Sequence, residues 1–142
     1  MLSPADVIRA CWERVQARHW EDGRKTLHDH IEVDWPASNE RILGPDDMLA
    51  VNHEYPEGWS IRVLEIRANG HRVAREIEVP MAGEHTLRVA SFWPVQEKKI
   101  SKGTESWISL GQDDVPTWHQ RFTVPVDEAS LSWLDLTSRW AG

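Results

Sequence analysis

The sequence has 142 residues, a length typical of one domain with one hydrophobic core. Its 23 acidic residues against 16 basic residues give a net charge of −7, which repels phosphate backbones and anionic lipid headgroups, so neither a nucleic acid nor a membrane is an expected partner. The single cysteine cannot close an intrachain disulfide, and the first residues run into a polar helix pattern without an apolar signal region, which predicts a cytoplasmic protein.

The first expected element is a helix that begins after Ser3. Ser3 supplies a hydroxyl N-cap, Pro4 takes the first helical position, and Asp6 places a carboxylate in the first turn. Apolar residues then follow at helical spacing: Val7, Ile8, Cys11, Trp12 and Val15. This spacing turns Trp12 toward the protein interior.

A shorter helical segment, a strand and a third helical segment follow. Residues 22–29 are expected to be helical, and residues 31–36 alternate as a strand that stops at a proline. In that strand Val33 and Trp35 share one face. Residues 44–55 begin with Gly-Pro-Asp-Asp, which places a proline and two acids in the first turn of a helix.

From residue 59 the pattern changes to four long β-runs. These are residues 59–68, 71–80, 85–95 and 100–110. The dipeptide Asn69-Gly70 is a strong signal for a tight hairpin between the first two, and two further reversals fall at residues 82–83 and 96–99. We therefore expect an antiparallel meander in sequence order, with the three helical segments on one face.

The C-terminal part of the chain has no clear periodicity. Residues 116–142 are predicted to form an irregular extension that contains Trp118, Trp133 and Trp140 and packs on the domain formed by residues 1–115. Within it, residues 127–134 are the one expected short helix.

Four local strings occur in a familiar order along the chain. They are Trp12-Glu13-Arg14, Val33-Asp34-Trp35-Pro36, Ile42-Leu43-Gly44-Pro45-Asp46, and Lys99-Ile100 leading to Gly103-Thr104-Glu105-Ser106-Trp107. Together with the order of the elements, they resemble the nuclear transport factor 2-like superfamily in its SnoaL-like branch, which includes polyketide cyclase-like and ketosteroid isomerase-like proteins.

The resemblance implies an α+β fold of the cystatin-like kind. A cone-shaped, strongly curved antiparallel sheet would wrap around the three N-terminal helices, with a deep pocket on its concave face and a homodimer through its convex face. Residues 59–68 favour the dimer independently, because Ile61 and Val63 lie on one parity while Leu64 and Ile66 lie on the other. A sheet with one face in water would alternate cleanly.

Two charged residues are expected on the apolar concave face. Arg75 has the same parity as Val73 and Ile77 in its strand, and the resemblance turns Arg75 and Glu105 inward together. A buried guanidinium and a buried carboxylate are each costly alone, so they are expected to pair or to meet a polar ligand. Both are candidate catalytic residues; the alternative is an ion pair that only stabilises the fold.

The resemblance also locates a pocket. Positions that carry a tyrosine, an aspartate base and a second acid in the isomerase-like pattern read Trp12, Trp35 and Ser91 here, so steroid isomerisation by that mechanism is disfavoured. The residues expected to contact an apolar ligand and orient its polar group are Trp12, Trp35, Asn52, Tyr55, Ser91, Trp93 and Trp107.

No metal or cofactor is expected. His28, His30 and His53 offer a loose His-x-His pair without an acid at a convincing spacing. The sequence contains no Gly-rich phosphate loop and no Gly-x-Ser-x-Gly nucleophile motif. Cys11 is expected to be a small buried hydrophobe.

Three functions remain open from the sequence. The first is a cofactor-independent acid/base enzyme of isomerase, cyclase or hydrolase type, in which Glu105 transfers a proton of an apolar small molecule and Arg75 tunes it. The second is a non-catalytic protein that binds such a molecule through its tryptophans. The third is a dimeric interaction domain whose pocket is vestigial.

Overall fold

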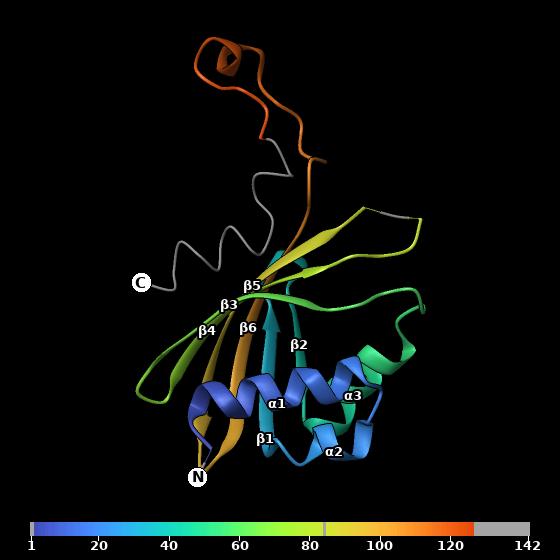
Figure 1. Ribbon diagram of the computed structural model, residues 1–142, viewed down its shortest axis with the longest axis vertical. Helices are drawn as coiled ribbons and strands as arrows, with labels where there is room; N and C mark the ends of the chain where they lie inside the picture. Colours follow the sequence, from blue (N-terminus) through green and yellow to red (C-terminus); the bar gives the residue numbers. More distant parts are fainter. Residues whose placement is uncertain (1, 84, 127–142) are drawn as a thin grey trace.

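Three helices lie against one face of a curved sheet (Figure 1). The computed structural model describes residues 2–83 and 85–126, and in these ranges the sheet has six strands. The elements in chain order are α1 (Pro4–Gln16), α2 (Trp20–Arg24), β1 (Leu27–Trp35), the 3-10 turn η1 (Pro36–Ser38), β2 (Glu40–Leu43), α3 (Pro45–Glu54), β3 (Arg62–Asn69), β4 (Arg72–Val79), β5 (Leu87–Gln96), β6 (Lys99–Ser109) and η2 (Thr117–Arg121).

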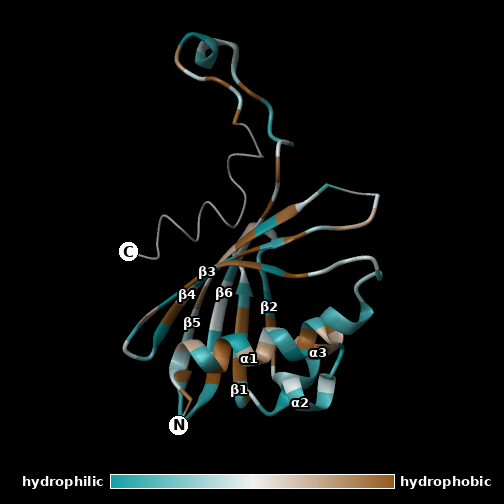
Figure 2. Cartoon of the chain, in the orientation of Figure 1, coloured by the Kyte–Doolittle hydropathy of each residue, from teal (hydrophilic) through white to brown (hydrophobic). Residues whose placement is uncertain are grey.

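The start of α1 follows its predicted capping chemistry. The Asp6 backbone N–H donates to the Ser3 hydroxyl at 3.2 Å, and the Ser3 N–H donates to the Asp6 carboxylate at 3.3 Å. This reciprocal capping box satisfies two N–H groups that the helix leaves free. The five apolar residues predicted for its inner side are all buried, and Figure 2 shows apolar residues on α1 and on the strands behind it.

The strand order is β2-β1-β6-β5-β4-β3. The meander from β3 to β6 is confirmed, and the Asn69-Gly70 hairpin joins β3 to β4. The prediction of a purely antiparallel sheet is wrong at one seam, because β1 pairs with β6 in parallel, with Val33 opposite Gly103. The N-terminal hairpin of β1 and β2 is therefore joined to the last strand, and the sheet is mixed.

Two element boundaries also differ from expectation. The second helix ends at Arg24 and β1 already begins at Leu27, because Leu27 pairs with Ile100 of β6 instead of continuing the helix. The run expected from residue 59 starts as a strand only at Arg62, and Trp59 forms an isolated bridge to Met81.

A bulge in β3 changes which face of the sheet its apolar residues point to. Val63 lies opposite Ile77 and Ile66 lies opposite Arg75, with a register shift between them. Opposite residues point to the same face, and both Ile77 and Arg75 are buried, so Val63 and Ile66 turn to one face despite their different parity. Ile66 is therefore no evidence for a second covered face, whereas Leu64, at the bulge, is 4% exposed and lies outside the core cluster. The homodimer itself is not tested by this strand.

The C-terminal extension leaves the domain after β6. Residues 112–126 run beyond the end of the sheet (Figure 1), and Trp118 and Phe122 are 68% and 66% exposed. The helix expected over residues 127–134, with Trp133, and the later Trp140 lie outside the described residues, so the packing of the extension on the domain stays a prediction. Across the described parts of the chain, every helix is too short or too polar to cross a membrane.

Candidate functional site

The helices and the sheet border a pocket with two adjoining parts. We call them the inner chamber, of about 40 Å³, and the outer chamber, of about 350 Å³. Both are walled by Asn52, Tyr55, Leu87 and Trp107. The inner chamber is further lined by Trp12, Trp59, Ile61, Ile77, Val79 and Glu105, and the outer chamber by Trp35, Ala37, Ser38 and Val51.

These volumes limit what the cavity can hold. A water molecule needs roughly 10–15 Å³ measured in this way, so the inner chamber has room for a few waters or for one small group of a ligand. The outer chamber falls within the range of about 300–1,000 Å³ that small-molecule sites occupy. The body of a ligand would therefore lie in the outer chamber, with one group directed at Glu105.

Arg75 and Glu105 belong to one row of residues across the sheet. Arg75 on β4 lies opposite Ser91 on β5, and Ser91 lies opposite Glu105 on β6. The small Ser91 between them leaves space for the Arg75 guanidinium, whose Nη2 lies 3.5 Å from Oε2 of Glu105. Their side chains are 0% and 2% exposed. The predicted placement of both residues on the concave face, within ion-pair reach, is confirmed.

The Glu105 carboxylate has a second donor. The indole N–H of Trp35 donates to its Oε1 at 2.9 Å. Burial raises the pKa of the Glu105 carboxyl, and the charge of Arg75 and the Trp35 hydrogen bond oppose that rise. The Arg75 contact is longer than the roughly 2.7–2.9 Å of a strong charge-assisted bond, so it offsets the burial only in part.

Arg75 is held mainly by aromatic faces. Its guanidinium carbon lies 4.0 Å from the centroid of the Trp12 ring and 5.5 Å from that of Trp93. Its Nε and Nη1 have no hydrogen-bond partner among the described residues. Burial lowers its pKa to about 10, and Glu105 opposes this change. Arg75 is thus a cation at neutral pH, stabilised by π-faces and one carboxylate.

Ser91 and Trp93 support this row from behind. The Trp93 indole N–H donates to the Ser91 hydroxyl at 2.7 Å, and that hydroxyl donates to the Arg75 carbonyl at 3.2 Å. The Trp93 ring packs directly on the backbone of Gly103. A Cβ at Gly103 would lie 2.9 Å from Cη2 of the ring and closer still to Cζ3 and Cε3. Glycine at this position is what allows the ring to approach.

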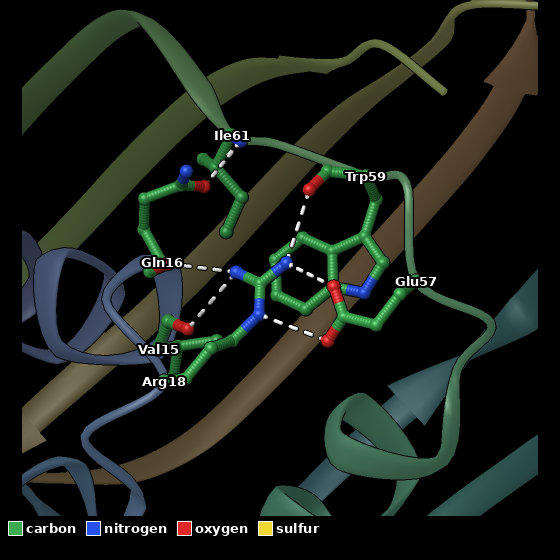
Figure 3. Close-up of polar contacts among 6 residues, drawn as sticks. All are labelled: Val15, Gln16, Arg18, Glu57, Trp59 and Ile61. Carbon is green, nitrogen blue, oxygen red and sulfur yellow. Dashed lines mark hydrogen bonds and ion pairs between the residues drawn. The ribbon is translucent and has the colours of Figure 1, made fainter. Parts of the chain in front are cut away.

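Trp59, which the sequence did not place in the site, is clamped by Arg18 (Figure 3). The Arg18 guanidinium lies 3.5 Å from the centroid of the Trp59 ring and donates to the Trp59 carbonyl at 3.1 Å. It also donates to both carboxylate oxygens of Glu57 and to the carbonyl of Gln16. The Gln16 side chain accepts from the Ile61 N–H at 2.6 Å. Gln16 at the end of α1 and Arg18 just after it thereby hold Ile61 and Trp59, two walls of the inner chamber.

The described residues offer no obvious metal centre. In residues 2–83 and 85–126, no group of three or more His, Cys, Asp or Glu side chains is arranged to hold a metal ion. Cys11 is buried, and burial raises the pKa of its thiol to about 11, so it is a neutral core residue. Among the residues that line the inner chamber, Glu105 carries the one carboxylate.

No protein-family model matches the sequence, and no curated protein matches it. Among solved structures, a Kribbella flavida protein named as a candidate ketosteroid isomerase has a TM-score of 0.80 at 24% identity, over 87% of this chain and 90% of its own. An NTF-2 like protein of unknown function from Burkholderia xenovorans has a TM-score of 0.70 at 19% identity, over 87% and 95% of the two chains. The chain has the nuclear transport factor 2-like fold.

The NTF2-like fold does not by itself assign a reaction. A LEH-like epoxide hydrolase from M. tuberculosis shares it with a TM-score of 0.60 at 15% identity, over 74% of this chain and 82% of its own. Proteins named for an isomerase and for a hydrolase therefore have this architecture, and activity must be argued from the residues of the pocket.

Six of the residues predicted for the site line the two chambers: Trp12, Trp35, Asn52, Tyr55, Glu105 and Trp107. Arg75, Ser91 and Trp93 line neither chamber, because Ser91 and Trp93 are bonded to each other and Arg75 lies behind Glu105. The walls that the sequence did not assign to the site are mostly aliphatic. Ile77 and Val79 have the same strand parity as Arg75, so the sequence could have placed them in the site. Trp59 lies outside the regular strands, so strand parity could not place it.

Proposed function

We propose that this protein is a cofactor-independent acid/base enzyme of SnoaL-like type that acts on an apolar small molecule. One observation carries the proposal: a buried carboxylate with a raised pKa lies in the wall of the inner chamber, between an indole N–H and a guanidinium. Carboxyl groups tuned in this way toward neutral pH are efficient in proton transfer.

In this proposal Glu105 is the catalytic residue. It takes a proton from the bound molecule, or from a water beside it, and returns the proton at another atom. Trp35 and Arg75 are positioning residues, because each holds one oxygen of the carboxylate. The walls around the carboxylate are mostly apolar, and a ligand that fills the pocket would displace water, which strengthens the charge interactions made during proton transfer.

The test compares Glu105→Gln with wild type on a panel of bicyclic ketones and epoxides. NMR in deuterated water reports proton exchange and ring opening in one assay. For any compound that is turned over, Glu105→Gln should lower the rate by about a hundredfold or more, as for loss of a general base. Glu76→Gln is the matched control, because Glu76 lies on β4 with its side chain on the opposite face from Arg75.

A second variant separates catalysis from folding. Glu105→Asp keeps the charge for Arg75 but withdraws the carboxylate from the chamber, so an enzyme should lose rate while the melting temperature changes little. If Glu105→Gln turns the panel over at the wild-type rate, the catalytic assignment is wrong. If both variants only unfold more easily, the ion pair is structural.

A non-catalytic binding protein is the alternative. It is favoured by the fact that both oxygens of Glu105 already have partners within the chain. A binding protein should retain affinity for apolar bicyclic compounds after Glu105→Gln and should turn none of them over.

We also propose a homodimer through the convex face of the sheet. Phe92 and Ile108 support it, because they are 62% and 56% exposed on the strand faces opposite to the buried Val89 and Trp93 of β5 and to the half-buried Trp107 of β6. Light scattering at micromolar concentration should give twice the mass of one chain, and Phe92→Asp should give the monomer. Val124→Asp, on the extension, is the control.

A further inference from the structure

The inner chamber contains hydrogen-bond donors that the chain leaves unused. The indole N–H groups of Trp12, Trp59 and Trp107 are buried without a hydrogen-bond partner, and all three residues line this chamber. Trp12 and Trp59 are 5% and 7% exposed, so bulk water does not solvate them. A buried N–H without a partner costs free energy, which makes three around one small space an unusual arrangement.

The other buried indoles show that the fold can satisfy such groups. Trp35 donates to Glu105 and Trp93 donates to Ser91. Among the buried indoles of the described residues, the unused donors thus belong to tryptophans that line the chamber; the Nε and Nη1 of Arg75, which lines neither chamber, are also without a partner. Two of these tryptophans are also rigidly held: Trp12 under the Arg75 guanidinium, and Trp59 under the Arg18 guanidinium and its clamp (Figure 3). Rigid donors lose little entropy when they bind an acceptor.

We infer that these indoles form a donor set for a hydrogen-bond acceptor oxygen on the ligand, such as the oxygen of a carbonyl, an ether or an epoxide. The ligand is then an apolar ring compound that enters the inner chamber oxygen first. Trp12, Trp59 and Trp107 are then the candidate specificity-determining residues. The inference rests on the proposed function only in taking this cavity as the ligand site; it needs no turnover.

Two probes of matched shape test this: 2-acetylnaphthalene, which carries a carbonyl oxygen, and 2-isopropenylnaphthalene, in which a CH₂ group replaces that oxygen. Dissociation constants are measured for wild type, Trp12→Phe, Trp59→Phe and Trp107→Phe. At one or more of these positions the ketone should bind about five- to tenfold more weakly, the amount expected for one lost hydrogen bond. The hydrocarbon should change less than twofold. Trp20→Phe, outside both chambers, should change neither.

An NMR experiment on the wild-type protein gives a test that does not depend on whether the variants fold. Addition of the ketone should move the indole N–H proton signal of at least one of the three tryptophans downfield, and addition of the hydrocarbon should not. Equal losses for both probes, or unmoved signals, would overturn the inference and leave water as the partner of these N–H groups. The two proposals can fail separately. If the tryptophan variants lose affinity for the ketone alone while Glu105→Gln has no catalytic defect, the donor set is supported and the enzyme is rejected.

Discussion

Replacing Gly103 by alanine should destabilise the protein far more than the addition of one methyl group usually does. The new Cβ would lie 2.9 Å from Cη2 of Trp93 and closer to two further ring atoms, whereas ordinary contacts begin at 3.4 Å. The ring is 1% exposed and cannot swing into solvent. It is also held by its hydrogen bond to Ser91 and by edge contact with Trp12 at a centroid distance of 5.7 Å.

The magnitude follows from what must move. Overpacking of a core costs about 1–3 kcal/mol, and displacement of the ring would also break the bond to Ser91, worth about 1 kcal/mol. The free energy of unfolding should therefore fall by about 2–4 kcal/mol. For a domain of this size, that lowers the melting temperature by roughly 10 °C.

Urea denaturation followed by circular dichroism measures this loss. Trp93→Phe removes the ring atoms that clash, so Gly103→Ala should cost less than about 1 kcal/mol in that background. Gly23→Ala is the control, because its Cβ would meet its neighbours at an ordinary 3.8 Å and its φ is not positive. An unchanged stability for Gly103→Ala, or the same loss in both backgrounds, would refute the packing argument.

Two further predictions concern the charged groups around the pocket. Burial raises the pKa of Glu105 above its ordinary value of 4.5, so the stability that this carboxyl contributes is complete below about pH 4.5 and is lost as the pH rises through the raised pKa. Denaturation curves should show this decline in wild type but not in Glu105→Gln. Arg75→Met should extend the decline to higher pH, because it removes the positive charge that opposes the rise of the pKa. Arg18→Met removes the clamp on Trp59 and should lower the free energy of unfolding by about 1–2 kcal/mol, with faster amide exchange at Ile61. Arg9→Met is the control: it breaks an exposed pair and should leave the stability nearly unchanged.

Local signals in the sequence predicted local structure well. The capping residues and apolar spacing of α1 and the Asn69-Gly70 hairpin depend on neighbours within a few positions, and all three are observed. The parallel pairing of β1 with β6 has no such signal, because two strands far apart in sequence meet only once the rest of the sheet is in place. The bulge in β3 is likewise invisible, since one extra residue shifts the parity without changing the composition.

The same difference between local and long-range signals explains how much of the site could be predicted. Arg75 and Glu105 could be placed on one face because the ladders from β4 to β6 run without a shift at the row that holds them. Ser91 was placed on the correct face but given the wrong partners, because its hydroxyl is committed to Trp93 and to a carbonyl. Which indole N–H groups stay free depends on packing in three dimensions. Parity alone cannot show this.

The central position of β6 has a consequence for how the chain reaches its native state. β6 lies between β1 and β5, so the first hairpin has no partner on its other edge until the last strand has been added. During synthesis, β1 and α1 would leave the ribosome long before that strand, with apolar surface still exposed. Folding should therefore be slow relative to helical domains of this length, because its decisive contacts are distant in sequence. A chain truncated before residue 99 would leave two separate sheets.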